Sequence, residues 1–239
     1  MKSIFAYDSP LMQILSYIGD LIILNFVFLL CCCPIFTIGA AQAGMYTAMR
    51  VLNDKEDDSS PLKAFFRGFT GGFLKVSIAW NLLFAVVAVM SVVGLYAYAF
   101  GLPAWACLVP ICIAALFQSL VPAFHSRFEC SPWQLIRNSW FLAVAHPLRS
   151  VGTALLIWIP VIVLLWPGEG IKLFMFMTPV WGTIYYSTAL LFSELFLRKP
   201  FKTLIDDFNA RHETEEEPES QMKLEEAEAN KIFHDVPSK

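Results

Sequence analysis

One stretch of the chain is apolar over an unusual length. Between Lys75 and Arg127, 51 consecutive residues include no Asp, Glu, Lys or Arg. A helix needs about 20 apolar residues to cross a bilayer, so this stretch is too long for one crossing and long enough for two. Gly101, Leu102 and Pro103 provide a turn near its middle. Soluble domains need a charged surface, so the pattern predicts an integral membrane protein.

Further charge-free stretches extend this pattern to a polytopic, all-α membrane helical bundle. They cover residues 21–49, 150–168 and 173–193. About six transmembrane helices account for all of these stretches. The predicted spans are 14–33, 35–52, 75–98, 104–125, 149–167 and 172–196.

The first two predicted spans leave an alternative open. Pro34 either separates two helices or kinks a single long one. A single helix over residues 14–52 would be about 58 Å long, roughly twice the hydrocarbon thickness of a bilayer. That length favours a hairpin that turns at Cys33 and Pro34. Thr37 is then expected to cap the second helix, whose small residues permit close helix packing.

The basic residues gather on one side of the predicted spans. Eleven Lys and Arg residues lie there, whereas Lys172 alone lies on the opposite side. Cytoplasmic loops of membrane proteins are enriched in Lys and Arg, so this side and both termini are predicted to be cytoplasmic. The eleven residues are Arg50, Lys55, Lys63, Arg67, Lys75, Arg127, Arg137, Arg149, Arg198, Lys199 and Lys202.

Three segments after the even-numbered spans share a pattern that predicts an internal repeat. They cover residues 61–69, 132–140 and 200–208, and each begins with proline, which is favoured at the first helical position. Apolar residues follow at helical spacing, with Arg137 interrupting the second copy. The pattern predicts three span-span-amphipathic-helix repeats, whose short helices lie at the headgroups or pack beneath the bundle. The candidate docking aromatics on these helices are Phe65, Phe69, Trp133, Trp140, Phe201 and Phe208.

Polar residues in or near the predicted spans are candidate functional residues, because lipid disfavours them. Neutral amides in such positions most often join helices by hydrogen bonds. Acidic side chains are expected to pair with cations at the same depth. The candidates are Asp20, Asn25, Gln42, Asn81, Gln118 and Glu194.

Basic residues near the cytoplasmic ends of the spans form a second candidate group. All of them except His125 can pair with Asp20 or Glu194, and the group can also hold an anionic lipid headgroup or phosphate. Cations at a helix C-terminus are also favoured by the helix dipole alone. This group comprises Arg50, Lys75, His125, Arg127 and Arg149.

Signatures of catalysis are missing from the sequence. It contains no Walker, HExxH or GxSxG motif, its four histidines are dispersed, and its six cysteines form no CxxC pattern. No ionisable residue falls at the predicted midplane of a span, which argues against an ion-coupled pump. The sequence therefore predicts a non-enzymatic protein without a cofactor or metal site and without a nucleic-acid partner.

The charge balance divides the chain into two predicted parts. Residues 1–205 hold 13 basic and 9 acidic residues, a net charge of +4, and are predicted to form the transmembrane bundle with its amphipathic helices. Residues 206–239 hold 4 basic and 11 acidic residues, a net charge of −7, and are predicted to form a disordered cytoplasmic tail. Such a tail either docks a basic partner or solubilises the end of the chain.

Residues 25–46 carry a combination of motifs that resembles the YesL family of bacterial membrane proteins. The segment has an apolar first span, Cys-x-x-Pro-Ile from Cys31, Thr-Ile-Gly-Ala from Thr37, and Tyr46 one turn before Arg50. Residues 65–75 and the amino-terminal residues 7–20 also look like that family. The resemblance covers residues 1 to about 205 and leaves out the acidic tail.

The resemblance implies a setting but no chemistry. The family has no established activity, and its genes often lie beside carbohydrate-uptake transporters and sugar-responsive regulators. It implies a bacterial cytoplasmic membrane and supplies no catalytic or ligand-binding residues.

Three functions are compatible with these observations. The first is a non-enzymatic membrane protein that is accessory to, or regulates, a bacterial carbohydrate uptake or sensing system, with its cytoplasmic helices as a docking platform. The second is a small-solute transporter or channel, which the repeat and the intramembrane amides support. The third is a structural or lipid-binding bundle. The expected partners are the lipid bilayer, anionic lipid, and membrane transporter or sensor proteins.

Overall fold

The computed structural model of the chain describes residues 10–53, 60–101 and 103–206, with the backbone alone for residues 104–107. Throughout these ranges the chain is helical and contains no strand, so the all-α prediction is confirmed for them. The chain divides into two compact units, Met1–Leu197 and Arg198–Lys239. The predicted acidic tail lies almost wholly outside the described residues, as does Phe208.

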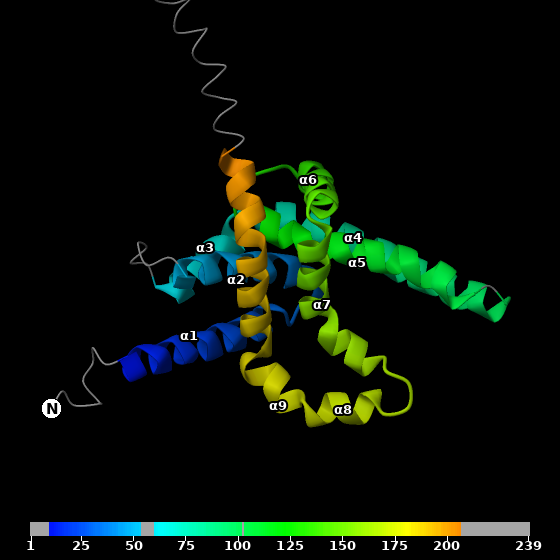
Figure 1. The fold of residues 1–239 in the computed structure, drawn as a ribbon, viewed down its shortest axis with the longest axis horizontal. Coiled ribbons are helices and arrows are strands. Elements are labelled where there is room, and N and C mark those ends of the chain that lie inside the picture. Colours follow the sequence, from blue (N-terminus) through cyan, green and yellow to red (C-terminus); the bar gives the residue numbers. More distant parts are fainter. Residues whose placement is uncertain (1–9, 54–59, 102, 207–239) are drawn as a thin grey trace, which may run out of the picture. The chain divides into compact units, whose positions relative to one another are not determined.

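The larger unit is built from helices of very different length (Figure 1). The elements are α1 (Pro10–Cys31), η1 (Ile35–Thr37), α2 (Ile38–Asn53), α3 (Pro61–Thr70), α4 (Phe73–Ala99), α5 (Ala104–His125), α6 (Pro132–Ala145), α7 (Pro147–Leu164), α8 (Gly170–Phe176), α9 (Thr178–Val180) and the π-helix η2 (Trp181–Tyr185). The residues 186–206 that follow these elements are also helical.

Among the described residues, four helices are long and apolar enough to cross a membrane, which supports a membrane protein. They match the first, third, fourth and fifth predicted spans. The four are Leu11–Cys31, Phe73–Ala99, Leu108–His125 and Pro147–Leu164.

The predicted second and sixth spans have different structures from those four. The second corresponds to α2, which has only 16 residues and is rich in Gly, Ala and Thr. The sixth is broken into α8, α9 and η2 before residues 186–206. Pro179, near the start of α9, has no backbone N–H to continue the preceding helix, and the π-helix then takes up an extra residue per turn.

The break between the first two helices falls where the sequence predicted it. α1 ends at Cys31 and α2 begins at Ile38, so a single kinked helix over residues 14–52 is wrong. Thr37 does not cap α2 with its side chain. Its hydroxyl instead donates to the carbonyls of Cys31 and Pro34, so it closes the end of α1 and fixes the turn.

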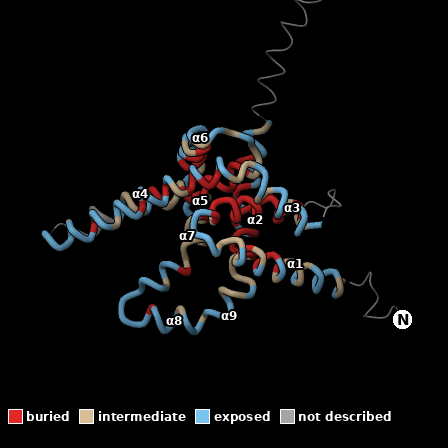
Figure 2. Tube along the Cα trace, turned by 180° about the vertical axis from the view of Figure 1, so that it is seen from behind, coloured by how far each residue is buried: buried red, intermediate tan, exposed pale blue. Residues whose placement is uncertain are grey.

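Helix α2 forms the buried centre of the larger unit (Figure 2). It contacts α1, α3, α4 and α5, and its contact with α3 is extensive. A Cβ at Gly39 would lie 2.5 Å from Cβ of Trp80, and one at Gly44 would lie 2.8 Å from the Phe65 carbonyl oxygen. The small face predicted for this segment therefore brings the backbones of neighbouring helices close to α2.

The first two prolines of the repeat begin helices, as predicted. Pro61 starts α3 and Pro132 starts α6, each after a serine at the N-cap. Pro200 does not start a helix, because residues 186–206 form one helix that passes through it. The third copy is therefore wrong as a separate helix: apolar residues before and after this proline sustain the helix despite one missing backbone donor.

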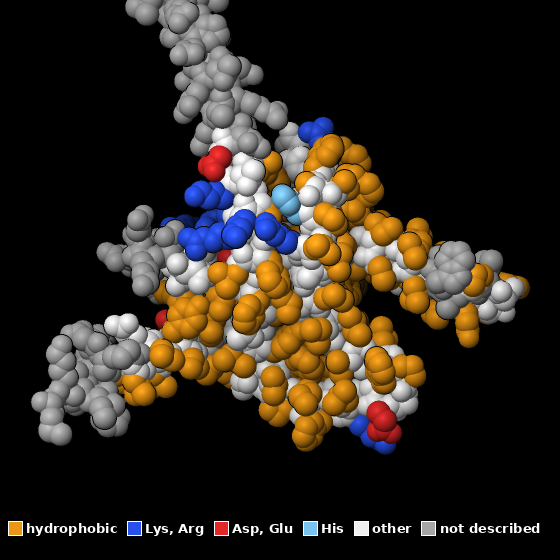
Figure 3. Space-filling view, viewed as in Figure 1, with side chains coloured by type: hydrophobic (Ala, Val, Ile, Leu, Met, Phe, Trp, Pro, Cys, Tyr) orange, Lys and Arg blue, Asp and Glu red, His pale blue; other side chains and the backbone are white. Residues whose placement is uncertain are grey.

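Hydrophobic side chains cover much of the surface around α4, α5, α7 and α8 (Figure 3). Only 17% of the residues in α7 are buried within the structure. Soluble proteins rarely expose an apolar surface of this extent to water, whereas helices that face lipid typically do.

Candidate functional site

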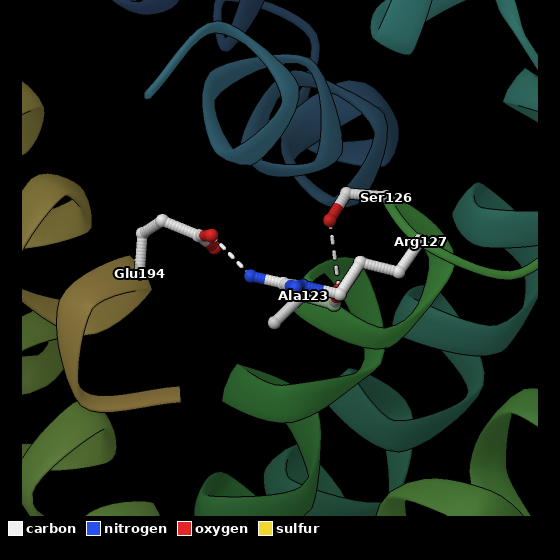
Figure 4. A network of polar contacts seen from close by, with 4 residues as sticks. All are labelled: Ala123, Ser126, Arg127 and Glu194. Atoms are coloured by element: carbon white, nitrogen blue, oxygen red, sulfur yellow. Dashed lines mark hydrogen bonds and ion pairs between the residues drawn. The ribbon is translucent and has the colours of Figure 1, made fainter. Parts of the chain in front are cut away.

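A buried ion pair joins α5 to the helix of residues 186–206. The Arg127 guanidinium donates to the Glu194 carboxylate, and their side chains are only 9% and 4% exposed (Figure 4). Two charges removed from water are tolerable only when each neutralises the other. The structure thus pairs Glu194 with Arg127, one of the four cations considered for it from the sequence.

The end of α5 directs Arg127 into this position. The backbone N–H of Ser126 donates to the Pro122 carbonyl at 3.0 Å, and that of Arg127 donates to the Phe124 carbonyl at 3.1 Å. The Ser126 hydroxyl also donates to the Ala123 carbonyl at 2.8 Å (Figure 4). These bonds continue the helical turn past His125, so the arginine leaves α5 with a fixed direction.

Helix α2 supplies a tyrosine to the same region. The fully buried hydroxyl of Tyr46 lies beside Ser193 and within electrostatic reach of both Arg127 and Glu194. Three separate segments therefore converge on one polar cluster inside an apolar unit. We call Tyr46, Arg127, Ser193 and Glu194 the central polar cluster.

His125 links the same end of α5 to the turn between α3 and α4. Its Nε2 donates to the Gly71 carbonyl at 2.7 Å, so the ring proton lies on Nε2. Gly72 has φ of 79°, and a Cβ there would lie 2.6 Å from Cε1 of the ring. A glycine is needed at this position both for its conformation and for the approach of the imidazole.

Asn25 holds the broken helix in place. Its Nδ2 donates to the Gly182 carbonyl at 2.8 Å, and its Oδ1 accepts from the Ser187 N–H at 3.1 Å. A π-helix disturbs the regular backbone bonds, and the buried amide satisfies a carbonyl within η2 and an N–H just after it. Asn25 therefore links α1 to the π-helix η2 by hydrogen bonds.

Asn81 also links two helices by hydrogen bonds. Its Nδ2 donates to the Phe36 carbonyl at 2.9 Å and to the Ser77 carbonyl at 2.7 Å, which ties α4 to η1. Trp158 adds a similar link, because its Nε1 donates to the Ser119 hydroxyl at 3.1 Å and joins α7 to α5. Asn25 and Asn81 thus each link two helical segments through hydrogen bonds to the backbone.

The two glutamines differ from the asparagines. Gln118 is 1% exposed, and neither polar atom of its side chain has a hydrogen-bond partner in the described part of the chain. Oε1 of Gln42 is also buried and has no hydrogen-bond partner in the described part of the chain. A buried amide without partners costs about 1–3 kcal/mol, so these side chains are able to bond to a polar solute.

The remaining polar candidates lie apart from these contacts. Asp20 is partly exposed on α1, Arg50 and Arg149 are partly buried, and Lys75 is exposed in the first turn of α4. No ion pair between these four residues and any acid or base occurs within residues 10–53, 60–101 and 103–206. His125 and the side chain of Arg127 are buried and hydrogen-bonded within the larger unit, and a headgroup site at these two residues stays a prediction.

The candidate docking aromatics divide into inward and outward groups. Phe65 is completely buried and stacks on Phe69 with ring centroids 6.1 Å apart, so this part of α3 packs onto the bundle. Trp133 and Trp140 are exposed on α6. Phe201 lies beyond Leu197, in the smaller unit, and Phe208 lies outside the described residues.

Sequence reasoning missed several residues of these contacts. Ser187 and Ser193 carry no motif, and Tyr46 stood out only through the family resemblance. The adjacent glycines Gly71 and Gly72 were a usable signal, since such a pair marks a turn that another side chain can approach closely. In the described part, no group of three or more His, Cys, Asp or Glu residues could hold a metal ion.

Comparison with known proteins gives one match. Residues 21–93 match a family described as a protein of unknown function, DUF624. The matched region runs from α1 through α2 and α3 into α4, and it includes Asn25, Tyr46 and the Gly71–Gly72 turn. The similarity to an uncharacterised family is thereby supported. No curated protein matches the chain. No solved structure matches it either.

Proposed function

We propose that this chain is a non-enzymatic integral membrane protein, related to the YesL family, that is accessory to or regulates a bacterial carbohydrate uptake or sensing system. The four apolar helices and the match to an uncharacterised family support the membrane part of this proposal. The carbohydrate setting derives from the family resemblance alone.

The proposed arrangement in the membrane has six spans with both termini in the cytoplasm of a bacterial cell. In it, α2 and the broken segment 170–196 add two crossings to the four long helices. The shortness of α2 is tolerable because surrounding helices shield its backbone from lipid. Irregular backbone at η2 is tolerable for the same reason, since Asn25 satisfies it.

The observation that carries the accessory role is the way in which α3 is fixed. A Cβ at Gly68 would lie 2.4 Å from Oγ1 of Thr47, so α3 lies directly against α2 and cannot move freely. Its outward face then presents Leu62, Phe66 and Lys63 at the end of the bundle where cations gather. A rigid helix with alternating apolar and basic groups is suited to dock an acidic, partly apolar surface of a partner protein.

This proposal moves the docking residues from Phe65 and Phe69 to Leu62 and Phe66. Substituting the buried Phe65 would create a cavity and destabilise the protein by about 3–5 kcal/mol, which would obscure any effect on binding. Leu62 and Phe66 are 37% and 46% exposed, so replacing them should cost less folding stability than replacing the buried Phe65.

The test is co-purification in mild detergent from the native host, followed by mass spectrometry. The unaltered protein is expected to retain a subunit of a carbohydrate transporter or sugar sensor, and the Leu62→Ser/Phe66→Ser variant is expected to lose it. Val144→Ser, which changes an exposed residue of α6, is the matched control and should keep the partner. A carbohydrate-system partner that stays bound to the double variant at full yield would contradict the docking role of α3.

The second candidate function is a small-solute transporter or channel. The buried, unpartnered amide of Gln118 favours it, because a polar solute passing the bundle would find hydrogen-bonding groups there. This function predicts flux of a sugar or other small solute in proteoliposomes that falls when Gln118→Leu is introduced. Asn81→Leu serves as the comparison, since Asn81 already bonds to Phe36 and Ser77.

A further inference from the structure

Helix α6 presents a broad apolar face away from the larger unit. Trp133, Trp140, Phe141 and Val144 are 51–71% exposed, whereas Leu135 on the opposite face is fully buried. The helix begins with a capping box in which Ser131 and Gln134 exchange hydrogen bonds. Its orientation is therefore fixed at its start, and the outward face is a stable feature.

The position of α6 along the chain keeps it at the bilayer. It connects the apolar helices α5 and α7, with His146 alone between α6 and α7. Trp140 stacks on Phe117 of α5 with ring centroids 4.7 Å apart. Phe117 lies eight residues before His125, which is about 12 Å along the helix from its end. Trp140 of α6 therefore lies beside the last turns of a candidate membrane span, inside its end.

The apolar face of α6 continues onto α7. Leu148 is 90% exposed, and Val151 and Leu155 follow at helical spacing on the same candidate span. Only His146 separates the two helices along the chain, so the exposed Val144 and Leu148 are four residues apart. We therefore expect one neighbour to cover the outward face of α6 and the exposed start of α7. That neighbour is lipid, because a protein partner at α6 would have to extend along α7 within the membrane as well.

The composition of the face locates it within the bilayer. Arg137 is exposed and lies between Trp133 and Phe141 on the helical wheel. Tryptophan favours the boundary between headgroups and acyl chains, and arginine extends its charged end to lipid phosphates.

We propose that the outward face of α6 is a lipid-binding surface, inserted at the boundary of headgroups and acyl chains in one leaflet, with Arg137 on a lipid phosphate. This surface is distinct from the docking face of α3 and does not depend on the accessory function. It makes α6 an anchor that fixes the depth of α5 and α7.

Photo-crosslinking tests this proposal on the full chain, purified and reconstituted alone in phosphatidylcholine–phosphatidylglycerol vesicles. p-Benzoylphenylalanine replaces Phe141 or Val144 on α6. Leu155 on α7 is the reference for lipid exposure, and Thr70 on α3 is the reference for a position away from the apolar face. The lipid adducts at the two α6 positions are expected to be within about twofold of the yield at Leu155, and well above the yield at Thr70.

The other outcomes are decisive too. Crosslinks at Phe141 and Val144 that join only protein, whether the same chain or a second copy, would overturn the proposal while Leu155 still yields lipid adducts. So would the absence of any lipid adduct at both positions. Phosphatidylglycerol should be enriched in the α6 adducts and lose that enrichment in Arg137→Gln; equal enrichment in both proteins would remove the role of Arg137.

Discussion

Arg127 and Glu194, 67 positions apart in the sequence, form an ion pair in the interior of the larger unit. The pair connects the end of α5 to the last helix of that unit, and Tyr46 of α2 adjoins it. Its place near the predicted cytoplasmic ends of the spans gives it the role of a structural lock.

Glu194→Gln should destabilise the protein strongly, because it leaves the Arg127 charge buried without its counter-charge. We expect a loss of about 3–5 kcal/mol, measured as thermal unfolding in detergent. Glu169→Gln is the matched control, since Glu169 and Lys172 form an exposed pair that contributes at most about 1 kcal/mol. The exchanged pair Arg127→Glu/Glu194→Arg should recover part of the loss; equal effects of the two Gln variants would rule out a buried lock.

Gly44 and Gly68 should not tolerate alanine. A Cβ at Gly68 would lie 3.0 Å from the Gly44 Cα, so a methyl group at either position separates α2 from α3. Overpacking of this kind costs about 1–3 kcal/mol. Gly19→Ala is the control, because nothing lies within 4 Å of a Cβ there and alanine favours a helix. The order of melting temperatures among the three variants checks the α2–α3 contact.

Asn25→Leu should destabilise the backbone of the π-helix η2 locally, without unfolding the other helices. It removes the acceptor of the Ser187 N–H and the donor to the Gly182 carbonyl. Losing such a buried bond costs about 1–3 kcal/mol, so hydrogen exchange should accelerate by roughly tenfold to a hundredfold locally. Mass spectrometry of peptides covering residues 181–187 reports this change, with peptides from α2 as the internal reference. Acceleration spread evenly over the chain would contradict a local staple.

Cys130 should react slowly with maleimide near neutral pH. Burial raises the pKa of its thiol above the ordinary value, while the Lys75 charge partly opposes the rise. The thiolate is the reactive form, so the rate should keep rising with pH beyond the point where an exposed cysteine levels off. Lys75→Gln removes the opposing charge, which raises the pKa further and slows the reaction at a fixed pH. A faster reaction in that variant would show that the sign is wrong.

The same shift in the pKa of Cys130 sets the sign of its effect on stability. A thiol whose pKa is raised in the folded state favours folding below the unfolded pKa and loses that advantage as the pH rises above it. Cys130→Ser removes this loss, so the stability of the Ser variant relative to that of the unaltered protein should increase as the solution becomes alkaline. Unfolding curves of the two proteins across this pH range test the point.

The sequence predicted the elements whose signal is local. The charge-free runs located α1, α4, α5 and α7, and the Ser-Pro pairs at Pro61 and Pro132 located the starts of two short helices. These features depend on composition and on the missing proline N–H, so they can be identified without knowing the neighbours of each residue.

The parts that depend on distant contacts could not be predicted in the same way. The choice of Arg127 for Glu194 over other cations follows from how three helices meet, and sequence distance gives no indication of it. The inward turn of Phe65 depends on the close contact of Gly44 and Gly68. The prediction that a helix starts at Pro200 was wrong because proline both starts helices and occurs within them. Only the conformation of the preceding turn distinguishes the two cases.

The central claim is that the chain spans a bacterial cytoplasmic membrane with the α3 and α6 side in the cytoplasm. Labelling of single cysteines in intact cells with a membrane-impermeant maleimide tests it most directly. Two variants are compared: one keeps Cys130, and the other carries Glu169→Cys in the α7–α8 loop. We predict labelling of the 169 position in intact cells and of Cys130 only after permeabilisation. Labelling of Cys130 from outside intact cells would contradict the account.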